Sequence, residues 1–338
     1  MEQSISRTCI YVAAGRAIGA REPDPSVRNP DDLVEKLLGD ARTFGLDHPV
    51  VRALGLDYVE AMKTLDVVGN VRMMTVRTRF IDDALQRGVT GGATQVVILG
   101  AGFDTHAYRF QDLLSQTRVF EVDRAATQAL KKQRVNEVLG APPPNLTYVA
   151  IDFQHEDLAD VLLRHGYDRA QRTFVILEGV TMYLPEDVVR STLRFVASHP
   201  SGSGIVFDFV YRPLVELLSS DLSNVPAMAR SYLQRFMDLI KDEPWVFGIP
   251  VDGEREFLSQ CGLELRELLS VGGEESVKRY LTKADGTQVG AEAIAAAMAR
   301  MAERARAAGQ SPEQRIDAAR AREQQRRMNY QLADAFVP

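Results

Sequence analysis

Acidic side chains stand at the ends of several short apolar runs in the middle of the sequence. These runs are rich in β-branched and aromatic residues, as the strands of a covered parallel sheet are: 95–99, 118–123, 146–152, 173–179 and 204–210. Glu121 and Asp123 end the second run, Asp152 the third, and Glu178 lies near the end of the fourth. The carboxyl ends of parallel strands meet at one edge of a sheet, where α/β proteins bind ligands. One such acid is readily a loop cap, but acids at successive strand ends favour a binding site.

The first run leads into a glycine turn made of Gly100, Ala101 and Gly102. Glycine lets the backbone approach a ligand closely. Asp123 follows about 20 residues later, a spacing at which an acid accepts hydrogen bonds from ribose hydroxyls. Thr105 stands where the third glycine of the pyrophosphate-binding GxGxxG motif would be. The turn therefore favours a nucleoside over a dinucleotide.

The charges around this turn suit a cationic nucleoside. Asp104 would repel a phosphate but tolerates an ammonium group. Asp152 can accept a hydrogen bond from the amino group of adenine, and Phe153 can pack on the base. Glu178 and Gly179 add an acid and a close backbone approach at the fourth strand end. S-adenosylmethionine (SAM) carries a sulfonium and an ammonium group, and we predict it as the cofactor.

A methyl group moves from a sulfonium by in-line displacement, so the protein's main task is to position the acceptor. A carboxylate acceptor is already ionised at neutral pH and needs a cation and a donor to orient it. Arg77 or Arg79 can grip it in a bidentate manner, and Tyr183 can donate a hydrogen bond. A phenol or alcohol would need a base, for which His106 is the candidate.

Each of these residues also has a structural interpretation. Arg77 and Arg79 are close enough along a helix to pair with Asp82 or Asp83, and Tyr183 can pack in the core. We predict methyl ester formation on a small metabolite or peptide. The hydroxyl of a polyketide-like natural product, a SAM-binding protein without catalysis and a nicotinamide oxidoreductase stay open as alternatives.

The alternation of apolar runs with helical stretches predicts an α/β fold, with helices on both faces of a Rossmann-like sheet. A helical insert is expected at about 213–241, after the fifth strand. Its Leu, Met and aromatic residues favour a roof over a partly apolar acceptor. Strands expected at 263–270 and 276–282 would close a seven-stranded sheet with an antiparallel hairpin. We divide the chain into a helical N-terminal region, a core and a helical C-terminal extension: 1–92, 93–285 and 286–338.

Composition narrows the range of partners. The chain has 338 residues, of which 45% are hydrophobic and 25% charged, and a net charge of −6. No broad basic field is available for nucleic acid or an anionic membrane. The five histidines and the two cysteines, Cys9 and Cys261, show no spacing typical of a metal site or a disulfide framework. We expect a cytoplasmic monomer or homodimer without a metal.

The segments VRTRFIDDAL, VVILGAGFDTHAYRF, VFEVDRAA, AIDF and ILEGVTMYLPEDVV resemble the leucine carboxyl methyltransferase family. The likeness extends to its bacterial branch of class I SAM-dependent O-methyltransferases and runs in register from about residue 5 to 283. It implies a seven-stranded Rossmann-like methyltransferase with an N-terminal helical lid.

The resemblance also implies roles for individual residues. It places Arg77 near the methionine carboxylate or the acceptor, Gly100 against the methionine, Asp123 on the ribose, Asp152 and Phe153 at the adenine, and Glu178 beside the methionine. The sequence departs from the bacterial branch at His106, where that branch usually has arginine.

Overall fold

The computed structural model describes residues 6–338 except for 153–154, 226, 297–298, 300–302 and 304–329. Phe153 and most of the expected C-terminal helical extension therefore lie outside the described residues.

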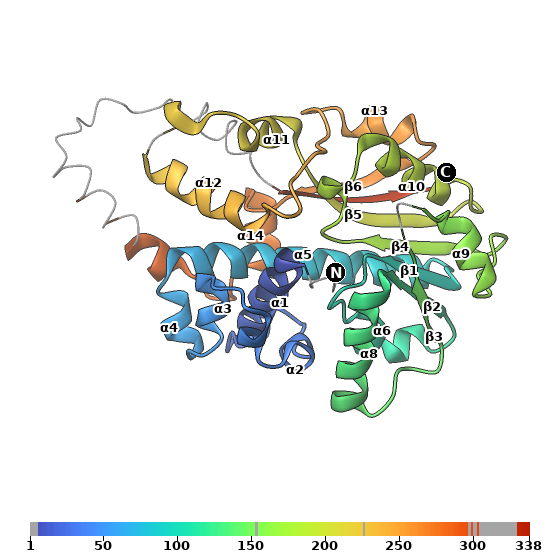
Figure 1. Cartoon of the computed structure of the whole chain (residues 1–338), viewed down its shortest axis with the longest axis horizontal. Helices are drawn as coiled ribbons and strands as arrows, with labels where there is room; N and C mark the ends of the chain where they lie inside the picture. The colour runs from blue at the N-terminus through green and yellow to red at the C-terminus, as the bar shows by residue number, and fades with distance from the viewer. Residues whose placement is uncertain (1–5, 153–154, 226, 297–298, 300–302, 304–329) are drawn as a thin grey trace.

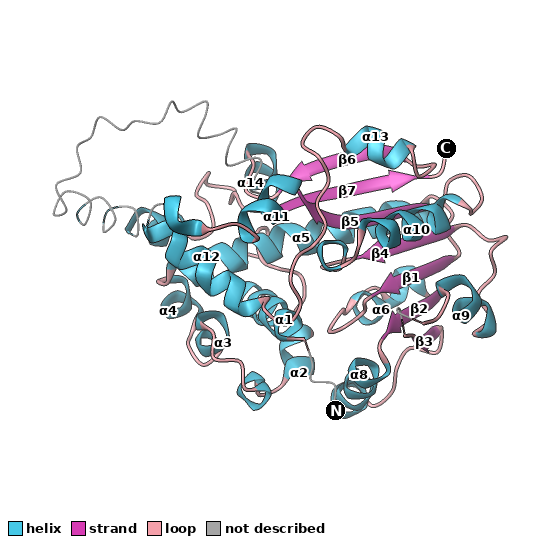
Figure 2. Cartoon of the chain, turned by 45° about the horizontal axis from the view of Figure 1, so that its top comes forward, coloured by secondary structure: helices cyan, strands magenta, loops and turns pink. Residues whose placement is uncertain are grey.

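A seven-stranded sheet forms the centre of the molecule (Figures 1 and 2). Its strands are β1 (Gln95–Leu99), β2 (Arg118–Asp123), β3 (Leu146–Ala150), β4 (Thr173–Leu177), β5 (Gly204–Val210), β6 (Glu264–Ser270) and β7 (Tyr330–Phe336). The order across the sheet is β3-β2-β1-β4-β5-β7-β6. The first five strands are parallel, and β7 runs antiparallel between β5 and β6. The predicted α/β class and the seven-stranded sheet are confirmed.

Successive side chains of each strand point to opposite faces of the sheet, and both faces are covered. In β1, Val96 and Ile98 belong to one buried cluster, whereas Val97 and Leu99 belong to the other. The second cluster lies under α9 (Leu158–Arg164), α10 (Glu186–Ala197) and α13 (Glu254–Ser259). The first lies under the N-terminal helices together with α6 (His106–Arg109), α7 (Gln111–Leu114) and α8 (Ala125–Leu139). Burial on both faces explains why the central strands are almost entirely apolar.

The N-terminal region is helical, as predicted. It contains α1 (Arg7–Gly19), α2 (Val34–Leu38), the short 3-10 turn η1 (Ala41–Phe44), α3 (Pro49–Ala53), α4 (Tyr58–Met62) and α5 (Leu65–Thr90). The long helix α5 runs along the sheet, and α1 packs on it (Figure 1). A Cβ atom at Gly15 would lie 1.7 Å from the Asn70 Oδ1 atom. Glycine at this position therefore lets α1 approach α5 closely, next to the carboxyl edge of the sheet.

The predicted helical insert follows β5. It consists of α11 (Arg212–Leu218), the 3-10 turn η3 (Leu222–Asn224) and α12 (Ala227–Leu239). A further 3-10 turn, η2 (Thr181–Tyr183), follows β4.

The prediction of a strand at 276–282 was wrong. Residues 276–280 instead belong to helix α14 (Glu274–Tyr280). This helix has acids in its first turn and Lys278 and Arg279 in its last turn. This charge order complements the helix dipole and outweighs the β-branched and aromatic residues of the segment. The partner of β6 is instead β7, so residues that we had placed in a helical extension form a buried strand of the sheet.

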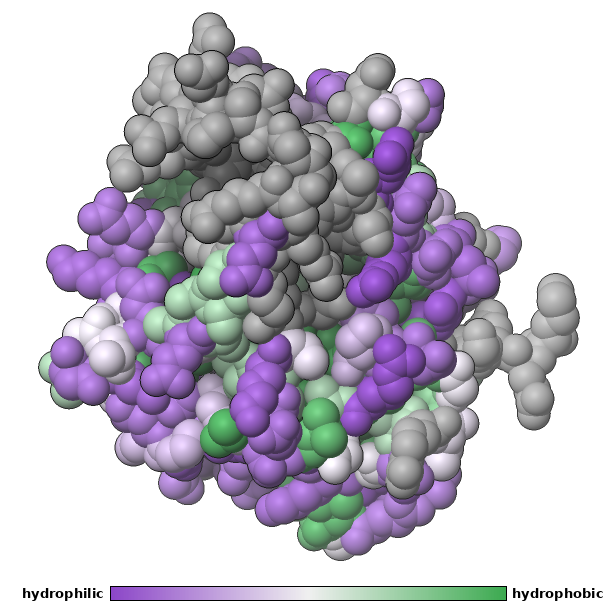
Figure 3. Space-filling view, turned by 90° about the vertical axis from the view of Figure 1, so that its left-hand side faces the viewer, coloured by the Kyte–Doolittle hydropathy of each residue, from purple (hydrophilic) through white to green (hydrophobic). Residues whose placement is uncertain are grey.

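Figure 3 views the end of the molecule where α4 and α12 lie. Its described part is mostly hydrophilic, with scattered apolar spots. Within the described part of the chain, no helix is both long and apolar enough to cross a membrane.

The position of β7 predicts that the C-terminal segment contributes strongly to stability. Leu332 in β7 is fully buried, so Leu332→Ala should lower the free energy of unfolding by about 2–5 kcal/mol. The control is Leu163→Ala on α9, where 43% of the side chain is exposed, and it should change stability by no more than about 0.5 kcal/mol. Urea unfolding followed by circular dichroism measures both; equal effects would contradict the central position of β7.

Candidate active site

A cavity of about 260 Å³ opens at the carboxyl edge of the sheet, beside α1. It brings together most of the residues that the sequence singled out: Arg77, Gly100, Ala101, Gly102, Asp104, Asp123, Glu178, Gly179 and Tyr183. Residues that the sequence analysis did not select also line it, from α1, from the segment after α12 and from β7: Thr8, Cys9, Arg16, Glu243 and Tyr330.

The glycine turn forms the floor of this cavity. Gly100 has a φ of 69°, a left-handed conformation that favours glycine. A Cβ atom there would also lie 2.6 Å from a methyl group of Val180. The Gly100 and Ala101 N–H groups donate to the Val122 carbonyl in β2. The turn is therefore fixed to β2, with its backbone open to the cavity.

Asp123, the last residue of β2, holds the next part of the turn. Its carboxylate accepts hydrogen bonds from the N–H groups of Gly102 and Arg124, each at 2.6 Å. Burial raises the pKa of Asp123 above its ordinary value. A carboxylate oxygen can accept more than one hydrogen bond, so Asp123 can hold the turn and still receive a ligand hydroxyl.

Two predicted cofactor contacts do not lie on the cavity. Glu121 comes two residues before the end of β2 and is therefore deeper in the sheet than Asp123. It pairs with Lys131 at 2.8 Å, and burial raises its pKa to about 7. Lys131 also donates a hydrogen bond to the Ala101 carbonyl. Glu121 therefore stabilises the glycine turn indirectly, through Lys131. Asp152 is exposed at the edge of the sheet and pairs with His155 at 2.8 Å.

Arg77 on α5 is fully buried between two acids. Its guanidinium lies 2.7 Å from the Glu178 carboxylate and 3.0 Å from that of Asp208, a buried residue of β5. Burial opposes the positive charge, but the two carboxylates raise the pKa of Arg77. Burial also raises the pKa of Asp208 to about 6, against the opposing effect of Arg77. Asp208 in turn accepts a hydrogen bond from the Gly179 N–H at 2.7 Å.

This group contains one cation and two carboxylates. When both acids are ionised, Arg77 cannot neutralise them, and a negative charge is left at the wall of the cavity. The Nε atom of Arg77 is buried and has no hydrogen-bond partner among the described residues, and the same holds for Arg16 Nε. The cavity thus combines excess negative charge with two arginines, Arg77 and Arg16, in its lining.

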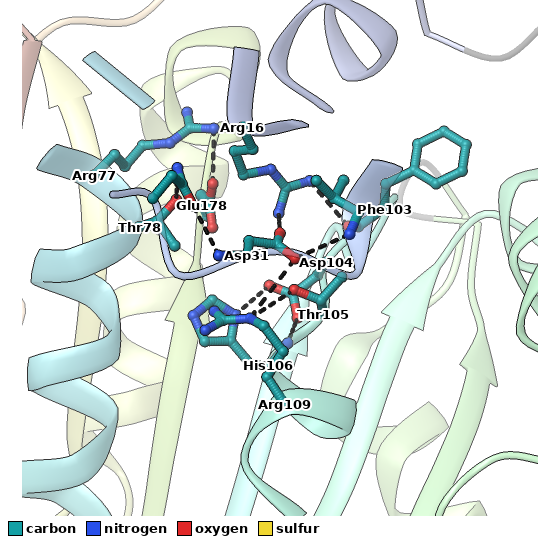
Figure 4. Close-up of polar contacts among 12 residues, drawn as sticks. Arg16, Asp31, Arg77, Thr78, Phe103, Asp104, Thr105, His106, Arg109 and Glu178 are labelled. Carbon is teal, nitrogen blue, oxygen red and sulfur yellow. Dashed lines mark hydrogen bonds and ion pairs between the residues drawn. The ribbon is translucent and has the colours of Figure 1, made fainter. Parts of the chain in front are cut away.

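A second ion network ties the glycine turn to the N-terminal helices (Figure 4). Arg16 on α1 lies 3.0 Å from the Asp31 carboxylate and donates to the Phe103 carbonyl in the turn at 2.9 Å. Arg109 on α6 lies 3.8 Å from the other Asp31 oxygen. It also donates to both oxygens of Asp82 on α5, at 2.9 and 2.7 Å.

His106 completes this network. Its Nδ1 atom lies 2.7 Å from Asp104, which lines the cavity, and its Nε2 atom lies 3.0 Å from Asp82. Burial disfavours the charged imidazole, yet the two acids raise the pKa of His106 to about 10. His106 is therefore protonated at neutral pH and cannot act as the base that we had considered. The network of Arg16, Arg109 and His106 with Asp31, Asp82 and Asp104 is balanced, with three cations and three anions.

Asp104, His106 and Glu178 place their ligand atoms within 4.8 Å of one another, a spacing that could hold a metal ion. A metal needs a neutral imidazole with a free nitrogen. In this structure each of the three side chains has an ionic partner: Asp104 and His106 belong to the balanced network, and Glu178 pairs with Arg77.

The remaining predictions concern Arg79 and Tyr183. Arg79 donates to the backbone carbonyls of Arg28 and Pro25, so it braces the segment after α1 and does not reach the cavity. Tyr183 in η2 lines the cavity and contacts the ring of Trp245, with ring centres 6.3 Å apart.

Glu243 joins three segments at the rim of the cavity. The hydroxyl groups of Ser6 and Thr8 donate to one of its oxygens, and Arg124 lies 3.5 Å from the other. The start of α1, the segment after α12 and the end of β2 therefore meet here.

Known methyltransferases resemble this chain in sequence. The sequence profile of the leucine carboxyl methyltransferases matches residues 9–197. A Frankia alni protein is 32% identical over 245 residues, covering 72% of this chain and 80% of that protein. A Mycolicibacterium smegmatis protein is 34% identical over 186 residues, covering 54% of this chain and 59% of its own length. Their names assign both to the S-adenosyl-L-methionine-dependent methyltransferases.

The fold is also found in a solved structure of a DUF574 family protein from Streptomyces avermitilis. The alignment covers 95% of this chain and 100% of that chain, with a TM-score of 0.50 and 15% identity. The chain described here belongs to the leucine carboxyl methyltransferase family.

The balanced network predicts that His106 stabilises the protein as a cation. His106→Gln would leave Asp104 and Asp82 buried without their shared partner, and should lower the free energy of unfolding by about 3 kcal/mol. The matched control is His155→Gln, which removes an exposed histidine–aspartate pair and should change stability little. Thermal and urea unfolding measure the difference. If His106→Gln is as stable as the control, the imidazole is not a charged partner.

Proposed function

We propose that this protein is a SAM-dependent O-methyltransferase that forms methyl esters on the carboxylate of a small metabolite or peptide. The observation that carries the proposal is the unbalanced charge of Arg77, Glu178 and Asp208 at the cavity wall. A buried negative charge without a partner is costly, and a cationic ligand would relieve it.

The same cavity suits the amino-acid end of SAM. The guanidinium groups of Arg77 and Arg16, which line the cavity, can attract its carboxylate. Glu178 and Asp104 can attract its ammonium group, and the glycine turn leaves room for the methionine chain. Asp123 would accept hydrogen bonds from the ribose hydroxyls.

The adenine would extend beyond this cavity. A second hollow, of about 640 Å³, lies against α9 and α10 and shares Leu99, Val180 and Leu184 with the first. Asp152 follows the end of β3, and Phe153 lies outside the described residues, so we keep their proposed adenine contact as an expectation.

SAM supplies an electrophilic methyl group, and the chain must place an acceptor oxygen in line with it. The described lining residues include no histidine, and His106 is a protonated member of the ion network. An ionised carboxylate needs no base, whereas a phenol or alcohol does. The site therefore favours a carboxylate acceptor.

Arg77 takes a different role from the bidentate grip that we expected. Two of its nitrogens are engaged by Glu178 and Asp208, so Arg77 cannot offer both to an acceptor. We assign Arg77 to the SAM carboxylate and to the placement of Glu178. Tyr183 is left as the residue that contacts the acceptor.

The pKa of Asp208 predicts how SAM affinity depends on pH. As the pH falls through about 6, Asp208 takes up a proton and the excess negative charge at Arg77 is lost. SAM affinity should then fall roughly tenfold. Asp208→Asn keeps an acceptor for the Gly179 N–H but is always neutral. Isothermal titration at several pH values should show weak, nearly pH-independent binding by this variant; a wild-type pH profile in Asp208→Asn would refute the assignment.

The reaction type can be tested with SAM that carries a tritiated methyl group and a panel of carboxylic acids and phenols. Methyl esters release methanol in mild base, whereas methyl ethers do not. We expect base-labile, volatile label with carboxylic acids and none with phenols. Base-stable label on phenols would show hydroxyl methylation. SAM binding without transfer to any compound in the panel would favour the non-catalytic alternative.

A further inference from the structure

Four aromatic side chains form a connected cluster beside the cavity. Trp245 is its centre: the ring centres of Phe236, Tyr330 and Tyr183 lie 4.8, 5.5 and 6.3 Å from that of Trp245. The planes meet Trp245 at 73°, 70° and 78° respectively, which is the edge-to-face geometry that aromatic rings prefer.

The cluster has an inner and an outer layer. Tyr183 and Tyr330 line the cavity and are only half-buried. Trp245 is buried, with 6% exposed, and Phe236 lies behind it on α12. Among the described residues of the insert, Phe236 contacts this wall from behind, and none lines the cavity itself. Tyr183 comes from η2 and Tyr330 from the first position of β7, so the C-terminal strand delivers a residue to the site.

Both phenol groups can donate a hydrogen bond into the cavity. The Tyr330 hydroxyl donates to the Met182 sulfur, which is a weak acceptor, at 3.7 Å. Burial raises the pKa of Tyr330 well above its ordinary value, with a contribution from Asp208. Burial likewise raises the pKa of Tyr183. Both groups therefore stay protonated and neutral, and they can bind an anion without adding charge.

We propose that Tyr183 and Tyr330, backed by Trp245, form the acceptor subsite and select carboxylic acids that carry an aromatic ring. The phenol hydroxyls donate to the acceptor carboxylate, and the aromatic ring of the acceptor packs against the rings of the wall. This inference rests on the proposed methyltransferase function and names its substrate class.

The balance of the step fits these residues. One carboxylate oxygen forms a bond to the methyl carbon, the bond from that carbon to sulfur breaks, and sulfur keeps the electron pair. No proton is transferred, so neutral donors are sufficient. They are also needed, because Glu178 and Asp208 would repel an acceptor carboxylate that had no donor.

An aromatic group suits the wall better than an aliphatic one. Edge-to-face and offset contacts between rings strengthen binding by about threefold to tenfold beyond the effect of burying apolar area. A cyclohexyl group of similar size would bury a similar apolar area but would not form the aromatic ring contacts.

Trp245 is the only tryptophan of the chain, so its fluorescence reports directly on the wall. The protein would be saturated with S-adenosylhomocysteine, the demethylated product, and titrated with phenylacetate, cyclohexylacetate and phenylacetamide. Phenylacetamide has a neutral amide in place of the carboxylate, so it tests the need for the carboxylate. Cyclohexylacetate has a saturated ring, so it tests the need for an aromatic ring. The variants are Tyr330→Leu, which removes ring and hydroxyl, and Tyr330→Phe, which removes only the hydroxyl. Tyr280→Phe is the control, because Tyr280 donates to Asp83 on α5 and is not a cavity residue.

We expect phenylacetate to change Trp245 emission in a saturable manner and to bind about threefold to tenfold more tightly than cyclohexylacetate. Phenylacetamide should bind more weakly than phenylacetate. Tyr330→Phe should weaken phenylacetate binding but keep the preference for the ring. Tyr330→Leu should remove that preference, and Tyr280→Phe should behave as the wild type.

The inference is overturned if cyclohexylacetate binds as tightly as phenylacetate. It is also overturned if Tyr330→Phe binds both acids as the wild type does, or if none of the three probes changes Trp245 emission in protein that binds S-adenosylhomocysteine. Failure to bind S-adenosylhomocysteine itself would instead contradict the proposed function, so the two failures are distinguishable.

Discussion

The site depends on a single buried cation that faces two acids. Arg77 comes from the middle of the long helix α5, Glu178 follows the end of β4, and Asp208 lies in β5. This contact fixes α5 across the sheet and also fixes the loop after β4, because Asp208 binds the Gly179 backbone. One cation cannot balance two carboxylates, so the group that organises the edge of the sheet also leaves it short of positive charge.

The second ion network differs from the Arg77 group in its balance of charge. It is just as buried, but its cations and anions are equal in number, and it connects α1, α5 and α6 with the glycine turn. A balanced network can hold elements together without a ligand, whereas an unbalanced one benefits from binding a counter-charge. This difference separates the structural role of His106 from the ligand-binding role that we propose for Glu178, although both side chains lie close to Asp104.

The sequence was sufficient to predict the parallel strands and the residues at their ends, because buried strands and glycine turns have strong local patterns. Two of the residues selected in this way, Asp123 and Glu178, line the cavity. Glu121 does not line the cavity and pairs with Lys131, because the sequence does not show how deep a residue lies in a strand. Asp208 could have been found, since a lone acid within GIVFDFV needs a buried partner.

Tyr330 could not have been found in this way. The segment YQLADAF has few β-branched residues, and it becomes a strand because β5 and β6 pair with it on either side. Tertiary context overrides local preference at such a position. The acidic start and basic end of α14 were a local signal for a helix. The apolar residues of that segment led us to predict a strand instead.

The central claim is that the unbalanced cavity binds a cationic, methionine-derived nucleoside. Isothermal titration of the wild-type protein with SAM, and in a parallel experiment with NADH, tests it most directly. We expect saturable binding of one SAM per chain and no binding of NADH. Binding of NADH by a protein that does not bind SAM would contradict this claim, and so would the absence of SAM binding at neutral pH.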